Sequence, residues 1–175
     1  MPLGNRARTA LGVIVAVLGT ASVAVPSSSV ASDVPLGYQL MCLQTPTECK
    51  GGGASVAAGS DQLMGTLKRI NSQVNRSIRP RNDGGVDVWS VDVSSGDCED
   101  YALTKRRALI KAGVPASSLR LAYVKTRAGE GHAILVVKTT RGDFVLDNLN
   151  ASVRPLSQSG YRIISTSGAD PMAWS

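Results

Sequence analysis

Three residues of this chain have the types and the order that cysteine-based acyl transfer needs. Cys98 lies in residues 96–101 (GDCEDY), which open a predicted helix, and His132 is the single histidine of the chain. Asp147 ends a predicted strand further on. A thiol needs a base to activate it and a third group to orient that base. The set therefore predicts a cysteine hydrolase or acyltransferase with Cys98 as nucleophile, His132 as base and Asp147 as orienting group.

The surroundings of Cys98 act on its thiol in opposite directions. Only the thiolate is a good nucleophile, and the positive end of a helix dipole at Cys98 favours it. Asp97, Glu99 and Asp100 surround the thiol, and nearby carboxylates raise a thiol pKa. We expect these carboxylates either to cap the helix, as Asp97 is placed to do, or to bind a cation such as calcium.

A predicted hairpin brings His132 and Asp147 together. Residues 132–138 and 143–147 read as two strands joined by a short turn. If the turn has two residues, His132 and Asp147 share one face of the sheet, directly opposite each other or diagonal. The carboxylate would then fix the imidazole tautomer and leave the other ring nitrogen to face the thiol. A turn with an odd number of residues would place the two side chains on opposite faces.

The three cysteines divide into a pair and a single thiol. Cys42 and Cys49 lie seven residues apart, whereas Cys98 is distant from both. A loop of this size can close, so we predict a Cys42–Cys49 disulfide and a free thiol at Cys98. A zinc site made by the three cysteines and His132 is disfavoured, because no CxxC or HxxxH spacing prepares it.

The first 31 residues predict a secretory signal peptide. Arg6 and Arg8 give a positive start, residues 10–25 are apolar, and Ala31 ends a small-x-small pattern, with cleavage after Ala24 as a second option. An uncleaved N-terminal anchor is the alternative. Cleavage after Ala31 leaves 144 of the 175 residues, enough for one domain. We expect a periplasmic or secreted protein, because disulfides persist outside the cytoplasm.

Composition divides the remaining chain into an arm and a catalytic part of one domain. Residues 32–59 lack a period and read as a disulfide-stapled N-terminal arm and a flexible loop. Residues 60–175 carry the periodic segments and the candidate triad. Within them, residues 79–95 are rich in Asp, Gly and Ser and read as an ordered loop that leads into Cys98.

Periodicity predicts an α+β fold for the catalytic part. Apolar residues at helical spacing predict a helix that starts at Ser60 or Asp61 and ends before Pro80. A second helix is expected from Cys98 to Ala112. We expect this second helix to pack on an antiparallel sheet, because the connections between the following strands are short. The predicted strands are residues 119–125, 132–138, 143–147 and 161–165.

Charge and composition argue against nucleic acid as a partner. Without the signal peptide the chain has 17 basic and 13 acidic residues, and these charges are scattered. The densest basic cluster, Lys105-Arg106-Arg107 followed by Lys111, reads as a solvated face of the second helix. Because aromatic residues are few and no basic stripe is present, we expect no nucleic-acid binding. We expect a monomer.

The motifs together resemble the bacterial transglutaminase-like cysteine proteinases, whose best-known branch is the LapG-type periplasmic proteinase. The likeness implies a papain-like, transglutaminase-like fold and a catalytic triad of Cys98, His132 and Asp147. It also implies calcium near Asp97 and Glu99. The segments that carry it are residues 96–103 (GDCEDYAL) with Lys105, 131–133 (GHA) and 146–149 (LDNL), supported by residues 37–38, Cys42, Cys49, 71–75 and 87–89.

This resemblance implies an exported peptidase that cleaves a protein substrate through a thioester acyl-enzyme, with calcium near the site but no cofactor in the chemistry. For the LapG-type branch it implies a surface adhesin as substrate and an inner-membrane cyclic-di-GMP receptor as regulatory partner. One departure leaves both open, because only six residues separate Trp89 from Gly96, fewer than we expect for that branch. Two alternatives also stay open: a transglutaminase or deamidase that acts on glutamine side chains, and a non-catalytic binding domain.

Overall fold

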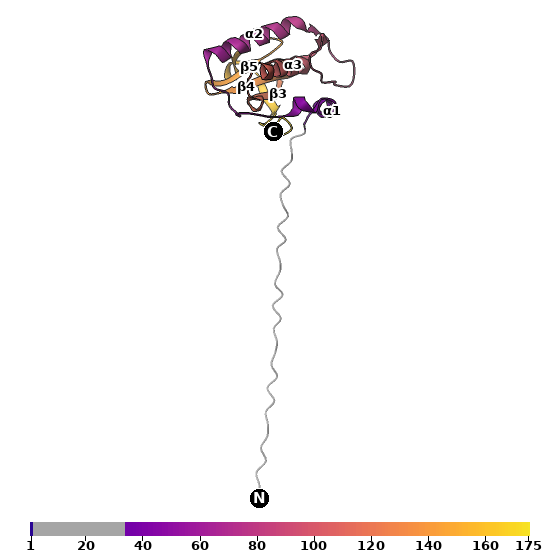
Figure 1. The fold of residues 1–175 in the computed structure, drawn as a ribbon. Coiled ribbons are helices and arrows are strands. Elements are labelled where there is room, and N and C mark those ends of the chain that lie inside the picture. Colours follow the sequence, from indigo (N-terminus) through magenta and orange to yellow (C-terminus); the bar gives the residue numbers. More distant parts are fainter. Residues whose placement is uncertain (2–33) are drawn as a thin grey trace.

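The computed structural model describes Met1 and residues 34–175, and Figure 1 shows how their helices and strands are arranged. The predicted signal peptide lies outside the described residues. Among the residues described, no helix is long and apolar enough to span a membrane.

One antiparallel sheet forms the centre of the fold, with the strand order β6-β5-β4-β3-β7. Four of its strands correspond to the four predicted from the sequence. The fifth, β6, is a two-residue edge strand that the sequence did not indicate. The strands are β3 (Leu119–Lys125), β4 (Gly131–Thr139), β5 (Gly142–Leu146), β6 (Arg154–Pro155) and β7 (Arg162–Thr166).

The β4–β5 hairpin has the two-residue turn on which the pairing of His132 with Asp147 depends. Thr139 pairs with Gly142 and Leu135 pairs with Leu146. In this register His132 and Asp147 are diagonal neighbours on one face, as the sequence predicted for one of the possible registers. Gly142 has φ +106°, a conformation that favours glycine at the end of the turn.

Two helices, α2 (Asp61–Ser77) and α3 (Cys98–Lys111), lie side by side over the sheet (Figure 1). Ser60 caps α2, because its side chain accepts a hydrogen bond from the Leu63 N–H at 3.0 Å. Asp97 occupies the N-cap position of α3, but its side chain makes no capping hydrogen bond. The expected capping role of Asp97 is therefore wrong, and its carboxylate is available for other contacts.

The N-terminal arm is more ordered than its sequence suggested. It forms α1 (Leu36–Gln44) and a 3-10 turn (Pro46–Cys49), and a disulfide joins Cys42 to Cys49. Tyr38 and Met41 are buried in the main core. The helix escaped prediction because it is short and its leucines are exposed, so it has no amphipathic pattern.

Apolar side chains cover both faces of the sheet. On the helix side, leucines such as Leu121, Leu135 and Leu146 pack against α2, α3 and the arm. On the other side, Ile134 and Val145 lie beneath Leu156 and Tyr161, which follow β6 in the chain. The helix that carries Cys98 is thus packed on the sheet that carries His132.

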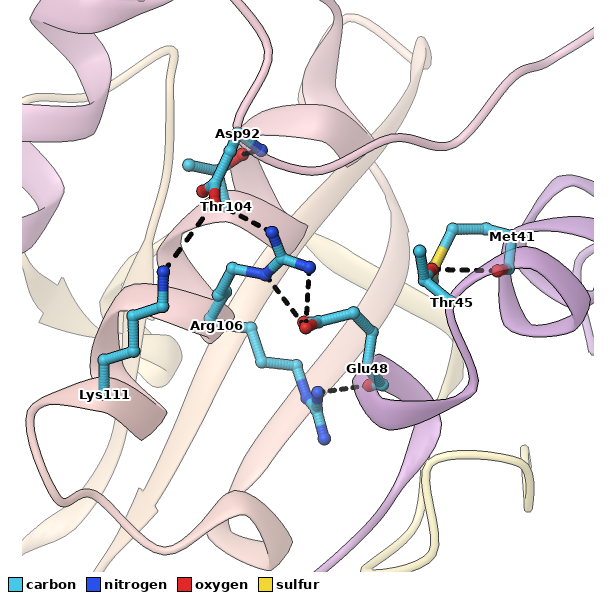
Figure 2. A network of polar contacts seen from close by, with 8 residues as sticks. Met41, Thr45, Glu48, Asp92, Thr104, Arg106 and Lys111 are labelled. Atoms are coloured by element: carbon cyan, nitrogen blue, oxygen red, sulfur yellow. Dashed lines mark hydrogen bonds and ion pairs between the residues drawn. The ribbon is translucent and has the colours of Figure 1, made fainter.

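Most of the basic cluster of α3 is not a solvated face, contrary to the prediction, and only Lys111 is exposed. Lys105 and Arg106 are buried, with 0% and 1% of their surface exposed. Arg106 donates hydrogen bonds to the backbone carbonyls of Glu48 (2.5 Å) and Lys50 (3.0 Å). Arg107 forms an ion pair with the Glu48 carboxylate at 2.8 Å, and Figure 2 shows this network between α3 and the arm. The prediction is wrong for these residues because Arg106 binds carbonyls and Arg107 a carboxylate within the fold, and Lys105 is buried.

A pair of two-residue strands, β1 (Arg79–Pro80) and β2 (Ser95–Gly96), runs parallel just before α3. Arg79 pairs with Ser95 and Pro80 pairs with Gly96. The loop of residues 81–94 therefore leaves and rejoins the body of the protein at one place, immediately before Cys98.

Candidate active site

Cys98 is the first residue of α3 and the free cysteine of the described chain. The backbone of Ala133, the residue that follows His132 in β4, acts on the Cys98 thiol in the direction that lowers its pKa, although burial outweighs this. Sγ of Cys98 lies 3.2 Å from Oε2 of Glu99. The packing of α3 on β4 thus brings the thiol to the strand that carries the candidate base.

His132 and Asp147 form a buried pair. Nε2 of His132 lies 2.8 Å from Oδ1 of Asp147, and the two residues are 4% and 1% exposed. The contact between the two side chains agrees with the hairpin argument. It leaves Nδ1 of His132 as the ring nitrogen that can exchange a proton with a thiol.

The carboxylate of Asp147 is kept ionised by its hydrogen bonds. Burial alone would raise its pKa, but bonds from His132, the Tyr161 hydroxyl and the Leu149 N–H outweigh burial and lower it. The Leu149 N–H donates to Oδ1 at 2.9 Å, and the Tyr161 hydroxyl donates to Oδ2 at 2.5 Å. An ionised carboxylate is what a buried imidazolium requires.

Two asparagines of α2 hold the backbone of Asp147. Asn75 donates from Nδ2 to the Asp147 carbonyl at 2.8 Å, and the Asp147 N–H donates to Oδ1 of Asn71 at 3.1 Å. Asn71 also donates to the carbonyls of Asn150 and Ala151. Helix α2 therefore fixes the end of β5 and the segment after it.

Tyr161 is a site residue that the sequence did not indicate. Besides its bond to Asp147, its ring packs edge-on against His132 with the ring centres 5.7 Å apart. The sequence offered only its position at the start of a predicted strand. It became part of the site because β7 pairs with β3, which places residue 161 near the start of β4.

An acidic cluster lies beside the thiol. Carboxylate oxygens of Asp83, Asp87 and Glu99 lie within 4.8 Å of one another. Asp97 is next to them, and its Oδ2 accepts a hydrogen bond from the Asp83 N–H at 3.2 Å. The sequence predicted Asp97 and Glu99 for this role. It did not indicate Asp83 and Asp87, although their loop was visibly rich in Asp and Gly.

The acidic cluster fits a hard cation such as calcium. Oδ1 of Asp97 and Oε1 of Glu99 are buried without a hydrogen-bond partner. Among the described side chains, no basic group forms an ion pair with these carboxylates. Calcium prefers a set of several such oxygens as ligands. Such an ion would satisfy the two unpaired oxygens and offset the negative charge.

The same cluster works against the nucleophile when no cation is bound. Burial, and next the charge of Glu99, raise the pKa of the Cys98 thiol to about 12. Burial, followed by the neighbouring carboxyl groups of Asp97 and Asp87, raises the pKa of Glu99 to about 9. Positive charge at this cluster would favour the thiolate by removing the repulsion.

Lys105 is a buried amine two turns after Cys98. Its Nζ has no hydrogen-bond partner and lies 5.6 Å from the centre of the Tyr101 ring. Burial lowers its pKa to about 7, against the opposing attraction of Asp147. A positive charge on Lys105 would therefore act on the triad from the helix side.

Comparison with known proteins points to one family. Residues 28–175 match the model of the family described as bacterial transglutaminase-like cysteine proteinase. The calcium-bound structure of Legionella pneumophila LapG is similar, with a TM-score of 0.56 and 25% sequence identity over 61% of this chain and 66% of LapG. The EGTA-treated form gives a TM-score of 0.55 and 25% identity over 59% of this chain and 62% of LapG.

The similarity therefore covers slightly less than two thirds of LapG. A comparison with curated protein sequences found no match. The α+β, papain-like fold predicted from the sequence is confirmed by these structures, and so is the resemblance on which part of the prediction rested.

Proposed function

Because the chain belongs to the bacterial transglutaminase-like cysteine proteinases, we propose that it is an exported cysteine peptidase with Cys98 as nucleophile. The observation that carries the proposal is the buried His132–Asp147 pair, whose Nε2 and Oδ1 are 2.8 Å apart. The thiol lies against Ala133, the next residue of the same strand. This arrangement supports the proposed roles of Cys98 as nucleophile, His132 as base and Asp147 as orienting carboxylate.

The proposed reaction proceeds through an acyl-enzyme. Nδ1 of His132 takes the thiol proton while the sulfur of Cys98 attacks the carbonyl carbon of the peptide. The backbone N–H of Cys98, at the start of α3, can donate to the oxyanion that forms. The imidazolium then gives its proton to the leaving amine, and a thioester remains. His132 next takes a proton from water, which attacks the thioester and releases the acid and the thiol.

We further propose that calcium occupies the acidic cluster, held by Asp83, Asp87 and Glu99 with Asp97 beside them. The fit of the cluster and the calcium-bound LapG structure support this. A bound cation would offset the carboxylate charge around the thiol. The residues of the chain still carry out every proton transfer of the reaction.

Export and a protein substrate complete the proposal. The predicted signal peptide and the Cys42–Cys49 disulfide both support a periplasmic or secreted location. A surface adhesin is the substrate, and an inner-membrane receptor the regulator, that the resemblance to the LapG-type branch implies. Both remain proposals for this chain.

The test is cleavage of a proteome-derived peptide library by the purified protein with calcium, with new termini identified by mass spectrometry. Cys98→Ala and His132→Ala should abolish cleavage, and Asp147→Asn should reduce it strongly. Asp61→Asn, which changes a carboxylate that is 96% exposed, is the matched control and should leave cleavage unchanged. Full activity of Cys98→Ala would refute the mechanism.

The same experiment separates the other functions of this fold. Addition of a labelled amine would give transamidated glutamines if the acyl group goes to an amine, and a mass increase of glutamine would reveal deamidation. A folded protein that shows none of these reactions, and whose Cys98 does not react with iodoacetamide, would be a binding domain.

A further inference from the structure

A cavity of about 340 Å³ lies next to the candidate triad. Its wall includes Tyr161, which bonds to Asp147 and packs against His132. Because one wall residue contacts both His132 and Asp147, the cavity is positioned to receive a part of the substrate near the scissile bond. Its chemistry then indicates which side chain it accepts, provided that the proposed peptidase function holds.

Arg154 is the distinctive group of this cavity. Its guanidinium carbon lies 5.5 Å from the centre of the Tyr161 ring, and the guanidinium charge opposes the burial that raises the pKa of the Tyr161 hydroxyl. Its Nε is buried without a hydrogen-bond partner. None of the ion pairs in the described part of the chain includes Arg154. A half-buried arginine with an unused donor is suited to a planar, two-oxygen anion.

The other charged residues of the cavity do not neutralise the positive charge of Arg154. Arg127 and Glu130 are both exposed and of opposite sign. A side chain on Gly160, which has φ +73°, would clash with the Arg127 guanidinium, so Arg127 lies across the backbone of the 158–161 segment. Leu149 adds an apolar wall. Arg154 is therefore the inner charge and the other two are at the rim.

We propose that Arg154 binds a carboxylate of the peptide substrate and so selects substrates with a negative charge close to the cleavage site. Tyr161 lies against both Arg154 and His132, each within 6 Å of its ring centre. One residue of an extended chain spans roughly 3.5 Å. The carboxylate therefore belongs to a residue within about three positions of the scissile bond.

The first test compares cleavage sites in the peptide library for the wild type and variants, each with calcium. The wild type should show Asp or Glu enriched at one fixed position, and Arg154→Gln should lose roughly tenfold of the preference for Glu over Gln there. Arg154→Lys should restore part of it. Arg162→Gln removes an exposed arginine of β7 that does not line the cavity, and it should retain the preference.

The preference is the ratio of cleavage rates of a Glu and a Gln substrate by the same variant. A general loss of activity lowers both rates equally and leaves this ratio unchanged. Enrichment of cuts near the free C-terminus, lost on amidated peptides, would show that the carboxylate is the chain terminus rather than a side chain. Cleavage without any preference for a carboxylate in the wild type would overturn the assignment of Arg154 and leave the peptidase function intact.

A second test needs no turnover and so remains decisive if no peptide is cleaved. Iodoacetate carries a carboxylate, whereas iodoacetamide is its neutral analogue. The alkylation rate of Cys98 with iodoacetate, divided by its rate with iodoacetamide, should fall severalfold in Arg154→Gln. This ratio should recover in Arg154→Lys and stay unchanged in Arg162→Gln. An equal ratio in wild type and Arg154→Gln would mean that Arg154 does not attract carboxylates at the site.

Discussion

Asp147 is held by more groups than a triad requires. His132 and the Leu149 N–H contact one of its oxygens, the Tyr161 hydroxyl donates to the other, and α2 bonds to its backbone. Each bond removes a way for the carboxylate to turn away from the imidazole. Orientation of His132 is therefore a property of the surrounding elements as well as of one aspartate.

Tyr161→Phe tests this orientation. The variant loses one hydrogen bond to a buried charge, so kcat should fall by roughly 10- to 100-fold. KM should change little, because phenylalanine keeps the ring that lines the cavity and the lost hydroxyl bonds to Asp147. Kinetics on the best library peptide, with the pH profile of kcat, measure the effect. The matched control is Tyr123→Phe, whose ring is 39% exposed on β3. Unchanged kcat in Tyr161→Phe would refute the positioning role.

The sequence could predict the contact between His132 and Asp147 in the candidate triad, but not the contact of Tyr161 with both. Cys98, His132 and Asp147 have the residue types that the chemistry needs. The chain has one histidine and one cysteine outside the disulfide, and the hairpin register places His132 and Asp147 on one face of the sheet. Tyr161 enters the site through a pairing of β7 with β3 that skips the intervening strands. No local pattern encodes which strand lies beside which, so such a contact needs the structure.

Lys105 should make folding stability depend on pH. Its pKa is lowered from 10.5 to about 7 in the folded protein. Between these values the unfolded chain binds a proton that the folded chain does not, so this residue makes stability rise with pH. Below pH 7 the folded state carries the full penalty of a buried charge, and above about pH 10.5 the penalty is absent.

Lys105→Met should therefore stabilise the fold, by roughly 2–4 kcal/mol below pH 7 and progressively less as pH rises. Urea unfolding from pH 6 to pH 9 measures the difference. Lys68→Met, at an exposed position of α2, should show no such trend. A difference between Lys105→Met and wild type that is the same at every pH would contradict the prediction.

Helix α3 joins three parts of the molecule. Its first residue carries the thiol, its apolar side packs on the sheet, and Arg106 and Arg107 hold the disulfide-stapled arm (Figure 2). The sequence predicted the helix and its bounds, because its start and stop signals are local. It did not predict which side of the helix the arginines use, because their partners come from the arm.

Helix α1 packs closely at Gly37 against the loop of residues 81–94, which carries Asp83 and Asp87. A side chain on Gly37 would meet the ring of Trp89 and the carbonyl oxygen of Asp87, the latter at 2.7 Å. Trp89 in turn donates from Nε1 to Oδ2 of Asp87 at 2.7 Å. The arm thus sets the position of a residue of the acidic cluster.

Gly37→Ala should weaken calcium binding at least severalfold and destabilise the fold by about 1–3 kcal/mol, because Trp89 and Asp87 must move. Gly65→Ala is the matched control, since Gly65 is also helical but has open space around it. That control should stabilise the protein by up to about 1 kcal/mol and leave calcium affinity unchanged. Calorimetric titration with calcium and urea unfolding measure both effects. Equal calcium affinity in the two variants would show that α1 does not position the loop.

At the scale of the whole molecule, the proposed calcium site joins the loop between β1 and β2 to the helix that follows β2. Asp83 and Asp87 come from the loop and Glu99 comes from α3. A ligand that binds the folded state alone raises stability by about 2.7 kcal/mol at 100 times its Kd. Bound calcium should therefore stabilise the complete domain.

The melting temperature should rise by several degrees when calcium is added to protein stripped with EGTA. Magnesium at the same concentration should have a much smaller effect, because it prefers fewer, rigidly placed ligands. Asp87→Asn should lose most of the calcium response. If the melting temperature is the same with EGTA and with calcium, the acidic cluster does not hold the ion.

The fold class could be predicted from the sequence because its main elements are encoded by neighbouring residues. These elements are a hairpin with a two-residue turn, a capped helix and the helix that carries Cys98. The parts that the sequence did not predict are those in which polar residues from distant segments come together. Arg106 bonds to carbonyls of the arm, and Asp83 and Asp87 approach Glu99 across a loop. Such arrangements depend on distant segments, which residue periodicity does not report.

The parallel pair β1–β2 has a consequence for how this family can diversify. Because Arg79 and Ser95 are paired, the loop between them can gain or lose residues without shifting Cys98 relative to His132. Closing a longer loop costs little, about 0.6 kcal/mol for each doubling of length. The loop that carries Asp83 and Asp87 can therefore change in length as a separate module, while the geometry of the candidate triad stays unchanged.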